Sequence, residues 1–156
     1  MTDTLKSICG QCAFLLNPQL EFVPRELQRQ RELILRDLQE LTSAASLEHE
    51  KSVTVMSGCL FESVLYTFIQ GQSSYIASRR GSFTFNPEHN LNNYVSIFNR
   101  WFSGLLTIPD SVVDYRDMVH INRELTYPPD ECRNASREML RLLDSLLRKL
   151  AEYSAV

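Results

Sequence analysis

The chain has 156 residues, a length that suits one domain of ordinary size. Apolar residues make up 44% and charged residues 22%, which is the balance of a globular protein and excludes a disordered chain. With 16 basic and 19 acidic residues the net charge is −3, so the chain as a whole has no basic field for nucleic acid. No apolar run approaches the roughly 18 residues of a membrane span. The start of the chain makes a poor signal peptide, and we expect a cytoplasmic location.

The cysteines give no strong site. Cys9 and Cys12 have CxxC spacing, but no strand precedes them as a redox motif requires. A structural zinc site usually needs two close pairs of ligands, whereas Cys59 and Cys132 stand alone in separate helical patterns. We expect reduced cysteines of the core, no metal and no other cofactor. A redox or zinc role for Cys9 and Cys12 is a distant alternative.

The first part of the chain is predicted to be helical. Residues 1–23 read as a lead-in with one short helix at about 4–16. Pro24 then stands where a first helical position should be. Apolar residues at helical spacing predict a helix over 25–41, which the run TSAAS is expected to end.

The middle of the chain carries two clear helical patterns. Ser46 can cap a helix that runs to about Ile69. This helix is apolar on more than one side, which is typical of a helix in the middle of a bundle. Breaker residues make 78–90 irregular. The helix predicted over 93–106 has the most regular apolar stripe, with Trp101 in its centre.

The last third predicts a short helix and a long one. The short helix runs from Pro109 to about His120, and the long one from Asp130 to about Tyr153. The succession of helices predicts an all-α fold, an up-down bundle of about four or five helices. We expect a single domain over 1–156, with the bundle itself over 24–153.

The densest group of chemically active side chains lies in the predicted short helix. Arg116 and His120 are four residues apart, about 40° from each other around a helix, and Asp117 can reach the imidazole. Arginine binds phosphate, histidine moves protons near neutral pH, and a carboxylate fixes the tautomer of the histidine. This set suits cleavage of a phosphodiester without a metal. The same residue types also form ordinary ion pairs between helices, so a structural role stays open.

Three segments, taken in order, carry a family resemblance. Residues 57–65 read SGCLFESVL, residues 115–122 read YRDMVHIN, and residues 127–131 read YPPDE. They are similar to the Glu-x-x-Leu helix, the Tyr/Phe-Arg-Asn-x-Ile-His-Pro segment and the start of the final helix in one branch of HEPN-type helical proteins. The resemblance covers roughly residues 46–150.

The resemblance implies a small α-bundle, commonly a homodimer, from a bacterial toxin–antitoxin, phage-defence or CRISPR system. Active members are metal-independent endoribonucleases. Their motif implies Arg116 and His120 as catalytic residues, with Asp117 as the polar residue between them. RNA would be the substrate, and an antitoxin or another defence protein would be a partner. Glu62 would support the site by pairing with Arg116; the alternative is that Glu62 faces solvent.

The chain departs from that motif in three ways. Only three residues separate Arg116 from His120 instead of four to six, Asp117 replaces the commoner Asn, and Ile121 follows the histidine where the branch has Pro. The pair therefore also fits HEPN-like proteins that act in assembly. A non-catalytic dimerising or adaptor bundle, in which these residues are structural, is the alternative function.

Other polar residues carry weaker signals. Arg79 and Arg80 precede two phenylalanines and could contact RNA by charge and stacking. They also suit a helix C-terminus, where the helix dipole favours basic residues, and we favour this interpretation. His49 and His89 are expected at the surface.

Overall fold

The structure, a computed structural model, describes residues 3–117 and 128–154, without the side chains of Pro129 and Cys132. Within these ranges all regular structure is helical, which confirms the prediction of an all-α bundle. The elements are α1 (Leu5–Gln11), α2 (Ala13–Leu16), the 3₁₀ turn η1 (Arg25–Leu27), α3 (Gln28–Ser46), α4 (Glu50–Gly71), α5 (Ser73–Arg80), α6 (Leu91–Phe102), α7 (Ser111–Arg116) and α9 (Pro129–Ser154). The helices are more numerous than predicted because the lead-in and the connections form short helices of their own.

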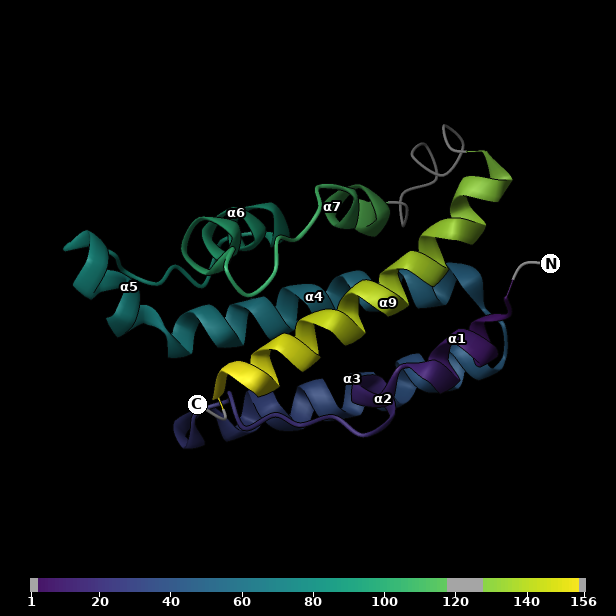
Figure 1. Ribbon diagram of the computed structural model, residues 1–156, viewed down its shortest axis with the longest axis horizontal. Coiled ribbons are helices and arrows are strands. Elements are labelled where there is room, and N and C mark those ends of the chain that lie inside the picture. Colours follow the sequence, from purple (N-terminus) through teal and green to yellow (C-terminus); the bar gives the residue numbers. More distant parts are fainter. Residues whose placement is uncertain (1–2, 118–127, 155–156) are drawn as a thin grey trace.

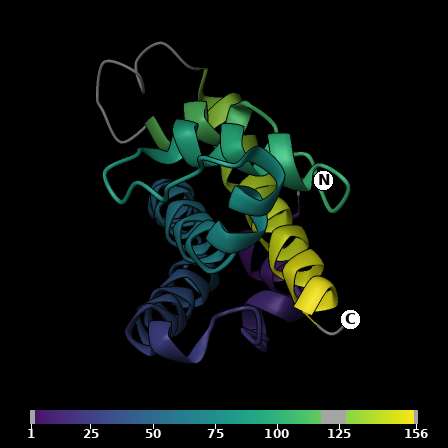
Figure 2. The same ribbon diagram turned by 90° about the vertical axis from the view of Figure 1, so that its left-hand side faces the viewer.

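Helix α4 is the centre of the bundle. It packs against the two other long helices, α3 and α9, and its remaining side carries α6 and α7 (Figures 1 and 2). By length and composition α4 would be apolar enough to cross a membrane, which the sequence analysis did not anticipate. However, 61% of its most apolar window is buried inside the protein. A helix that is covered on several sides needs this composition, so the central position predicted for it is confirmed.

The lead-in is part of the core. Cys12 leaves the helical conformation and divides the predicted short helix into α1 and α2. Both pieces lie against α3 and α9 (Figure 1). The fully buried residues that they and the following segment contribute include Leu5, Ile8, Leu15 and Leu20. Burial of these side chains binds the N-terminal segment to the bundle through the hydrophobic effect.

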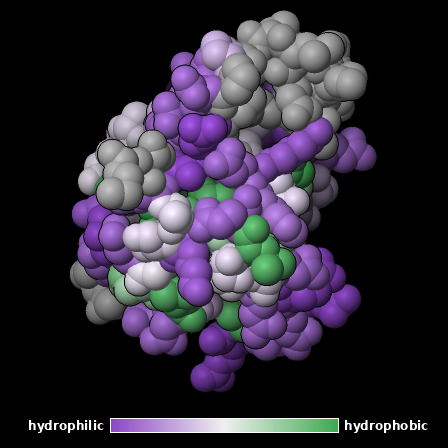
Figure 3. Space-filling view, turned by 90° about the vertical axis from the view of Figure 1, so that its right-hand side faces the viewer, coloured by the Kyte–Doolittle hydropathy of each residue, from purple (hydrophilic) through white to green (hydrophobic). Residues whose placement is uncertain are grey.

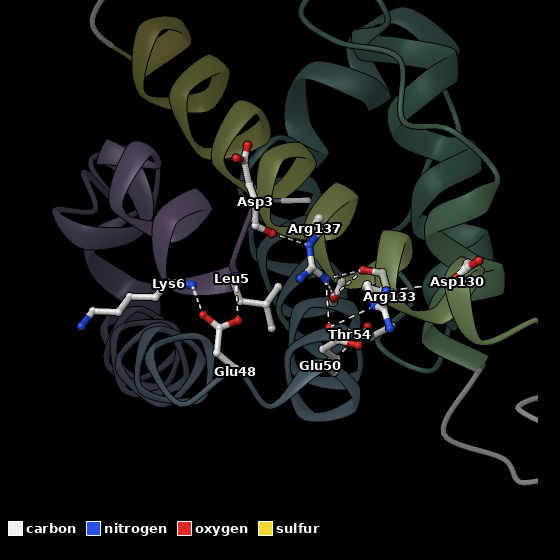
Figure 4. A network of polar contacts seen from close by, with 10 residues as sticks. Asp3, Leu5, Lys6, Glu48, Glu50, Thr54, Asp130, Arg133 and Arg137 are labelled. Atoms are coloured by element: carbon white, nitrogen blue, oxygen red, sulfur yellow. Dashed lines mark hydrogen bonds and ion pairs between the residues drawn. The ribbon is translucent and has the colours of Figure 1, made fainter. Parts of the chain in front are cut away.

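Glu48 and Arg137 fasten the N-terminal segment by hydrogen bonds to its backbone (Figure 4). Glu48 accepts hydrogen bonds from the backbone N–H of Leu5 at 2.8 Å and of Lys6 at 3.0 Å, which satisfies two free donors at the start of α1. Arg137 of α9 donates to the carbonyl oxygen of Asp3 at 2.7 Å and to Glu50 at 3.1 Å. The N-terminal segment, α4 and α9 are thus joined by polar contacts as well as by apolar packing.

The predicted boundary between the two long helices is wrong. Helix α3 continues through TSAAS to Ser46, because Ala44 and Ala45 are buried and alanine is the strongest helix former. Ser46 is therefore the last residue of α3, and its hydroxyl donates to the carbonyl oxygen of Ser43. Helix α4 begins after His49, whose side chain makes no cap, and the turn between the helices places Glu48 at φ 60°.

Helix α6 begins earlier and ends earlier than predicted. Asn90 and Asn93 form a reciprocal capping box at its start. Its buried residues are Leu91, Tyr94, Val95, Phe98 and Phe102. Trp101 is only half-buried at the edge of this face, so the prediction that it occupies the centre of the stripe is wrong. The stripe of the sequence is real, but its centre is Phe98.

Candidate functional site

Helix α7 places Arg116 on the central helix. The helix is short and packs on α4, with Val112 fully buried as its apolar anchor. Arg116 is its last residue, and Asp117 follows as the C-cap. His120 lies outside the described residues. The described part of the predicted site is therefore Arg116, Asp117 and Glu62.

The ion pair expected between Glu62 and Arg116 is present. Arg116 donates from Nη2 to Oε2 of Glu62 at 3.1 Å, and its Nη1 lies 3.9 Å from Oδ1 of Asp117. The side chain of Arg116 is 37% exposed, that of Glu62 is 30% exposed and that of Asp117 is 33% exposed. The alternative in which Glu62 only faces solvent does not hold. The guanidinium is fixed by a carboxylate of the central helix and still reaches water.

A glycine allows this close approach. A Cβ atom at position 58 would lie 2.5 Å from Cγ and 3.2 Å from Cα of Arg116. Such distances are below van der Waals contact, so only glycine lets the stem of Arg116 lie directly on α4. Gly58 belongs to the segment 57–65 that carries the family resemblance, but no role was predicted for it. The sequence feature that could have indicated this role is a glycine in the middle of a long apolar helix. Glycine lowers the stability of a helix at such a position, so its presence there indicates a close contact.

The electrostatics of the site limit what Arg116 can bind. A partly exposed guanidinium with a fixed orientation can make a bidentate contact with a phosphate. Two carboxylates already balance its charge, so a phosphate must compete with Glu62 and Asp117. Proton transfer at a bound phosphate would need a further group, since arginine stays protonated.

Cys9 and Cys12 do not form a reactive pair. Both thiols are buried, and Sγ of Cys12 lies 3.9 Å from the carbonyl oxygen of Leu140. Burial, with a smaller effect of Asp144, raises the pKa of Cys9 and raises that of Cys12 to about 12. Neither thiol supplies the thiolate that redox exchange requires. Cys59 is exposed on α4, so the expectation of a core position is wrong for this cysteine.

No metal-binding cluster is present in the part of the chain that the structure describes. Within residues 3–117 and 128–154, no three His, Cys, Asp or Glu side chains come close enough to share an ion.

Arg79 and Arg80 end a helix, as the favoured interpretation expected. They are the last residues of α5, and Gly81 closes the helix in the left-handed conformation at φ 82°. The guanidinium of Arg79 lies 5.4 Å from the ring centre of Tyr75. The two phenylalanines that follow pack against the core instead of presenting their rings to solvent. Both arginines are exposed, so contact with RNA remains a separate prediction.

The two histidines in the described ranges differ. His49 is exposed as expected. His89 is half-buried, and its Nδ1 is buried without a hydrogen-bond partner among the described residues, so the expectation of a surface position is wrong. His89 and Glu62 line the same cavity of about 370 Å³. Sequence reasoning missed this cavity because its lining comes from four separate segments.

Comparison with known protein families, with curated proteins and with solved structures finds no match for this chain. The functional interpretation therefore depends on the geometry of the residues themselves and on the sequence motifs.

Proposed function

We propose that the chain is a HEPN-like protein that cleaves RNA without a metal, with Arg116 and His120 acting on one phosphodiester. The observation that carries the proposal is the guanidinium of Arg116, which Glu62 fixes while more than a third of the side chain stays exposed. A prepositioned cation of this kind stabilises the charge that grows on a phosphate during cleavage. His120, four residues further along the chain, would accept or donate the proton.

In this proposal each residue has a distinct role. Arg116 binds the phosphate, and His120 transfers a proton at the ribose 2′-hydroxyl or at the leaving oxygen. Glu62 is a positioning residue, because it contacts Arg116 and not the substrate. Asp117 carries a negative charge 3.9 Å from the guanidinium, which weakens phosphate binding. Arg79 and Arg80 would contact the RNA at a second place.

A second candidate has its own supporting observation. The charge of Arg116 is balanced by Glu62 and Asp117, and its stem packs on Gly58, as in an ion pair that holds two helices together. In this case the chain is a non-catalytic dimerising or adaptor bundle and Arg116 is structural. Under both proposed functions the protein is cytoplasmic, forms a homodimer and binds an antitoxin or another defence-system protein.

The discriminating experiment is an RNA cleavage assay in EDTA with the wild type and the variants Arg116→Ala and His120→Ala. The proposal predicts cleavage by the wild type and loss of nearly all cleavage in each variant, with unchanged melting temperature for His120→Ala. Asp117→Asn should keep or raise the activity, because it removes a charge that repels phosphate. No cleavage by a folded wild type, together with strong destabilisation by Arg116→Ala, would favour the adaptor.

A further inference from the structure

The cavity beside Glu62 has the size and position of a ligand site. It lies between α3, α4, α6 and the segment that precedes α6, and its volume is about 370 Å³. Small-molecule sites have volumes in this range and combine apolar walls with a few polar groups. Here the apolar wall is formed by Leu33, Ile34 and Pro87. The cavity is therefore large enough for a planar ligand such as a nucleobase.

The polar lining combines hydroxyl groups with the side chains of Gln30, Glu62 and His89. Nδ1 of His89 is buried and unpaired among the described residues. Glu62 uses Oε2 to accept from Arg116, and Gln30 uses Nε2 to donate to Gln70. No described hydrogen bond uses Oε1 of Glu62 or Oε1 of Gln30. When the imidazole of His89 carries its proton on Nε2, Nδ1 is a buried acceptor without a donor. This is unfavourable, and a ligand N–H can satisfy it. The cavity therefore favours a ligand that donates hydrogen bonds.

The charges around the cavity exclude a phosphate inside it. None of the described residues that line it is Lys or Arg, and the carboxylate of Glu62 is among them. A planar, uncharged ligand with adjacent N–H donors fits this lining. The Watson–Crick edge of guanine presents such donors, and proteins read unpaired RNA bases on that edge. We propose that the cavity binds a purine base, with guanine preferred to adenine.

The base pocket adjoins the phosphate site through Glu62. One carboxylate oxygen of Glu62 holds Arg116, while the same side chain lines the cavity. An RNA strand whose phosphate meets Arg116 would thus place a neighbouring base at the cavity. This assignment to RNA rests on the proposed function; a free purine nucleotide presents the same base chemistry without the strand.

Cys59 provides a direct probe, because its exposed thiol belongs to the lining of the cavity. Alkylation of Cys59 is followed by mass spectrometry at alkaline pH in a Cys132→Ser background, with guanosine, inosine, adenosine or uridine. When the guanosine concentration equals the dissociation constant of the complex, half of the cavities are occupied. Alkylation of Cys59 should then be about twofold slower. Inosine lacks the exocyclic amino group of guanosine and so loses one hydrogen bond to a charged acceptor. It should therefore give the same protection of Cys59 only at an about tenfold higher concentration. Uridine should not protect. Equal alkylation rates with all four nucleosides would overturn the proposal.

Matched variants separate the cavity from the rest of α4. Ser63→Leu fills the cavity, whereas Ser52→Leu makes the same change at an exposed position of the same helix outside it. His89→Phe keeps a ring and removes Nδ1. Equilibrium dialysis should show an about tenfold or greater loss of guanosine binding in Ser63→Leu and His89→Phe, and unchanged binding in Ser52→Leu. Unchanged guanosine binding in folded Ser63→Leu would place the ligand elsewhere and overturn the proposal.

The failure of this proposal is distinguishable from failure of the proposed function. Guanosine that binds at the cavity of a protein that cleaves no RNA supports the pocket and rejects the ribonuclease. Cleavage of RNA by a protein whose cavity binds no nucleoside supports the ribonuclease and overturns the pocket. Tighter binding of a short RNA with one guanosine than of free guanosine, lost in Arg116→Ala, identifies the ligand as RNA. Equal affinities would identify a free purine instead and contradict the assignment to RNA.

Discussion

Gly58 sets the distance between Arg116 and the central helix. A Cβ atom there would meet the stem of Arg116 at 2.5 Å and its backbone at 3.2 Å, so Gly58→Ala must displace the end of α7. Insertion of a methyl group at a tight contact costs about 1–3 kcal/mol of unfolding free energy. The displacement should also lower any RNA cleavage. Denaturant unfolding and the cleavage assay measure the two effects.

Gly10 offers the matched control. It lies in the helix α1, and no atom stands within 4 Å of a Cβ placed there. Gly10→Ala should therefore be neutral or stabilise by about 0.5–1 kcal/mol, as alanine does in place of a helical glycine. Equal effects of both substitutions would contradict the role of Gly58.

Glu48 makes the stability depend on pH. Hydrogen bonds from the backbone N–H of Lys6 and Leu5 lower the pKa of its carboxyl, although some loss of hydration opposes this shift. A carboxyl with a lowered pKa in the folded state stabilises the protein above its unfolded pKa, and this contribution disappears as the pH falls through the folded pKa. Glu48→Gln should therefore lower the melting temperature at pH 7 and have little effect once the pH is below about 3. Glu21→Gln, at an exposed position, should change the melting temperature equally little at both pH values.

At the scale of the element, α6 distinguishes a central residue from an edge residue. Phe98 is fully buried and its ring lies 5.9 Å from that of Phe68 and 5.8 Å from that of Phe102, whereas Trp101 is half-buried. Phe98→Ala should cost about 3–5 kcal/mol of unfolding free energy, as large core truncations do. Trp101→Ala should cost clearly less, although tryptophan is the larger residue. Chemical denaturation of both variants tests this order, and the reverse order would show that the other face of α6 is buried.

The elements also show what the sequence can and cannot predict. Hydrophobic patterns were sufficient to predict that α4, α6 and α9 exist, but not where α4 begins or where α6 begins and ends. The periodicity could not decide whether Trp101 lies at the centre or at the edge of the buried face of α6. Apolar residues at i, i+3 and i+4 fit two buried faces that differ by one residue at the edge. The end of α3 was missed because the serine and alanine run is compatible with a helix once the alanines are buried.

The sequence likewise predicts one part of the candidate site and not the other. A carboxylate on a central helix needs a partner, and the HEPN resemblance implied Arg116 as that partner, so the pair with Glu62 could be predicted. The cavity and the buried Nδ1 of His89 could not be predicted, because they arise where segments distant in sequence meet. The exposed thiol of Cys59 was missed for a related reason, because a helix in the middle of a bundle can still have one open strip.

At the scale of the whole molecule, we predict a homodimer that uses the surface of α7. Val113 is half-buried beside Arg116, and the mixture of apolar and charged groups is typical of an interface. The coloured residues of the face seen in Figure 3 are mainly hydrophilic, with hydrophobic residues in small separate groups. Sedimentation at micromolar concentration should show a dimer for the wild type and a monomer for Val113→Glu. Leu47→Glu, a matched change at an exposed leucine, should leave the dimer intact. A wild-type monomer would contradict the prediction.

The central claim is that Arg116 and His120 act as one unit on the same phosphodiester. The most direct measurement is a double-mutant cycle of RNA cleavage rates in EDTA, with Arg116→Ala, His120→Ala and the double variant, each checked for its melting temperature. Losses within a catalytic unit are not additive, so the double variant should be little slower than either single variant. Additive losses, or a folded His120→Ala variant that cleaves as fast as the wild type, would contradict the claim.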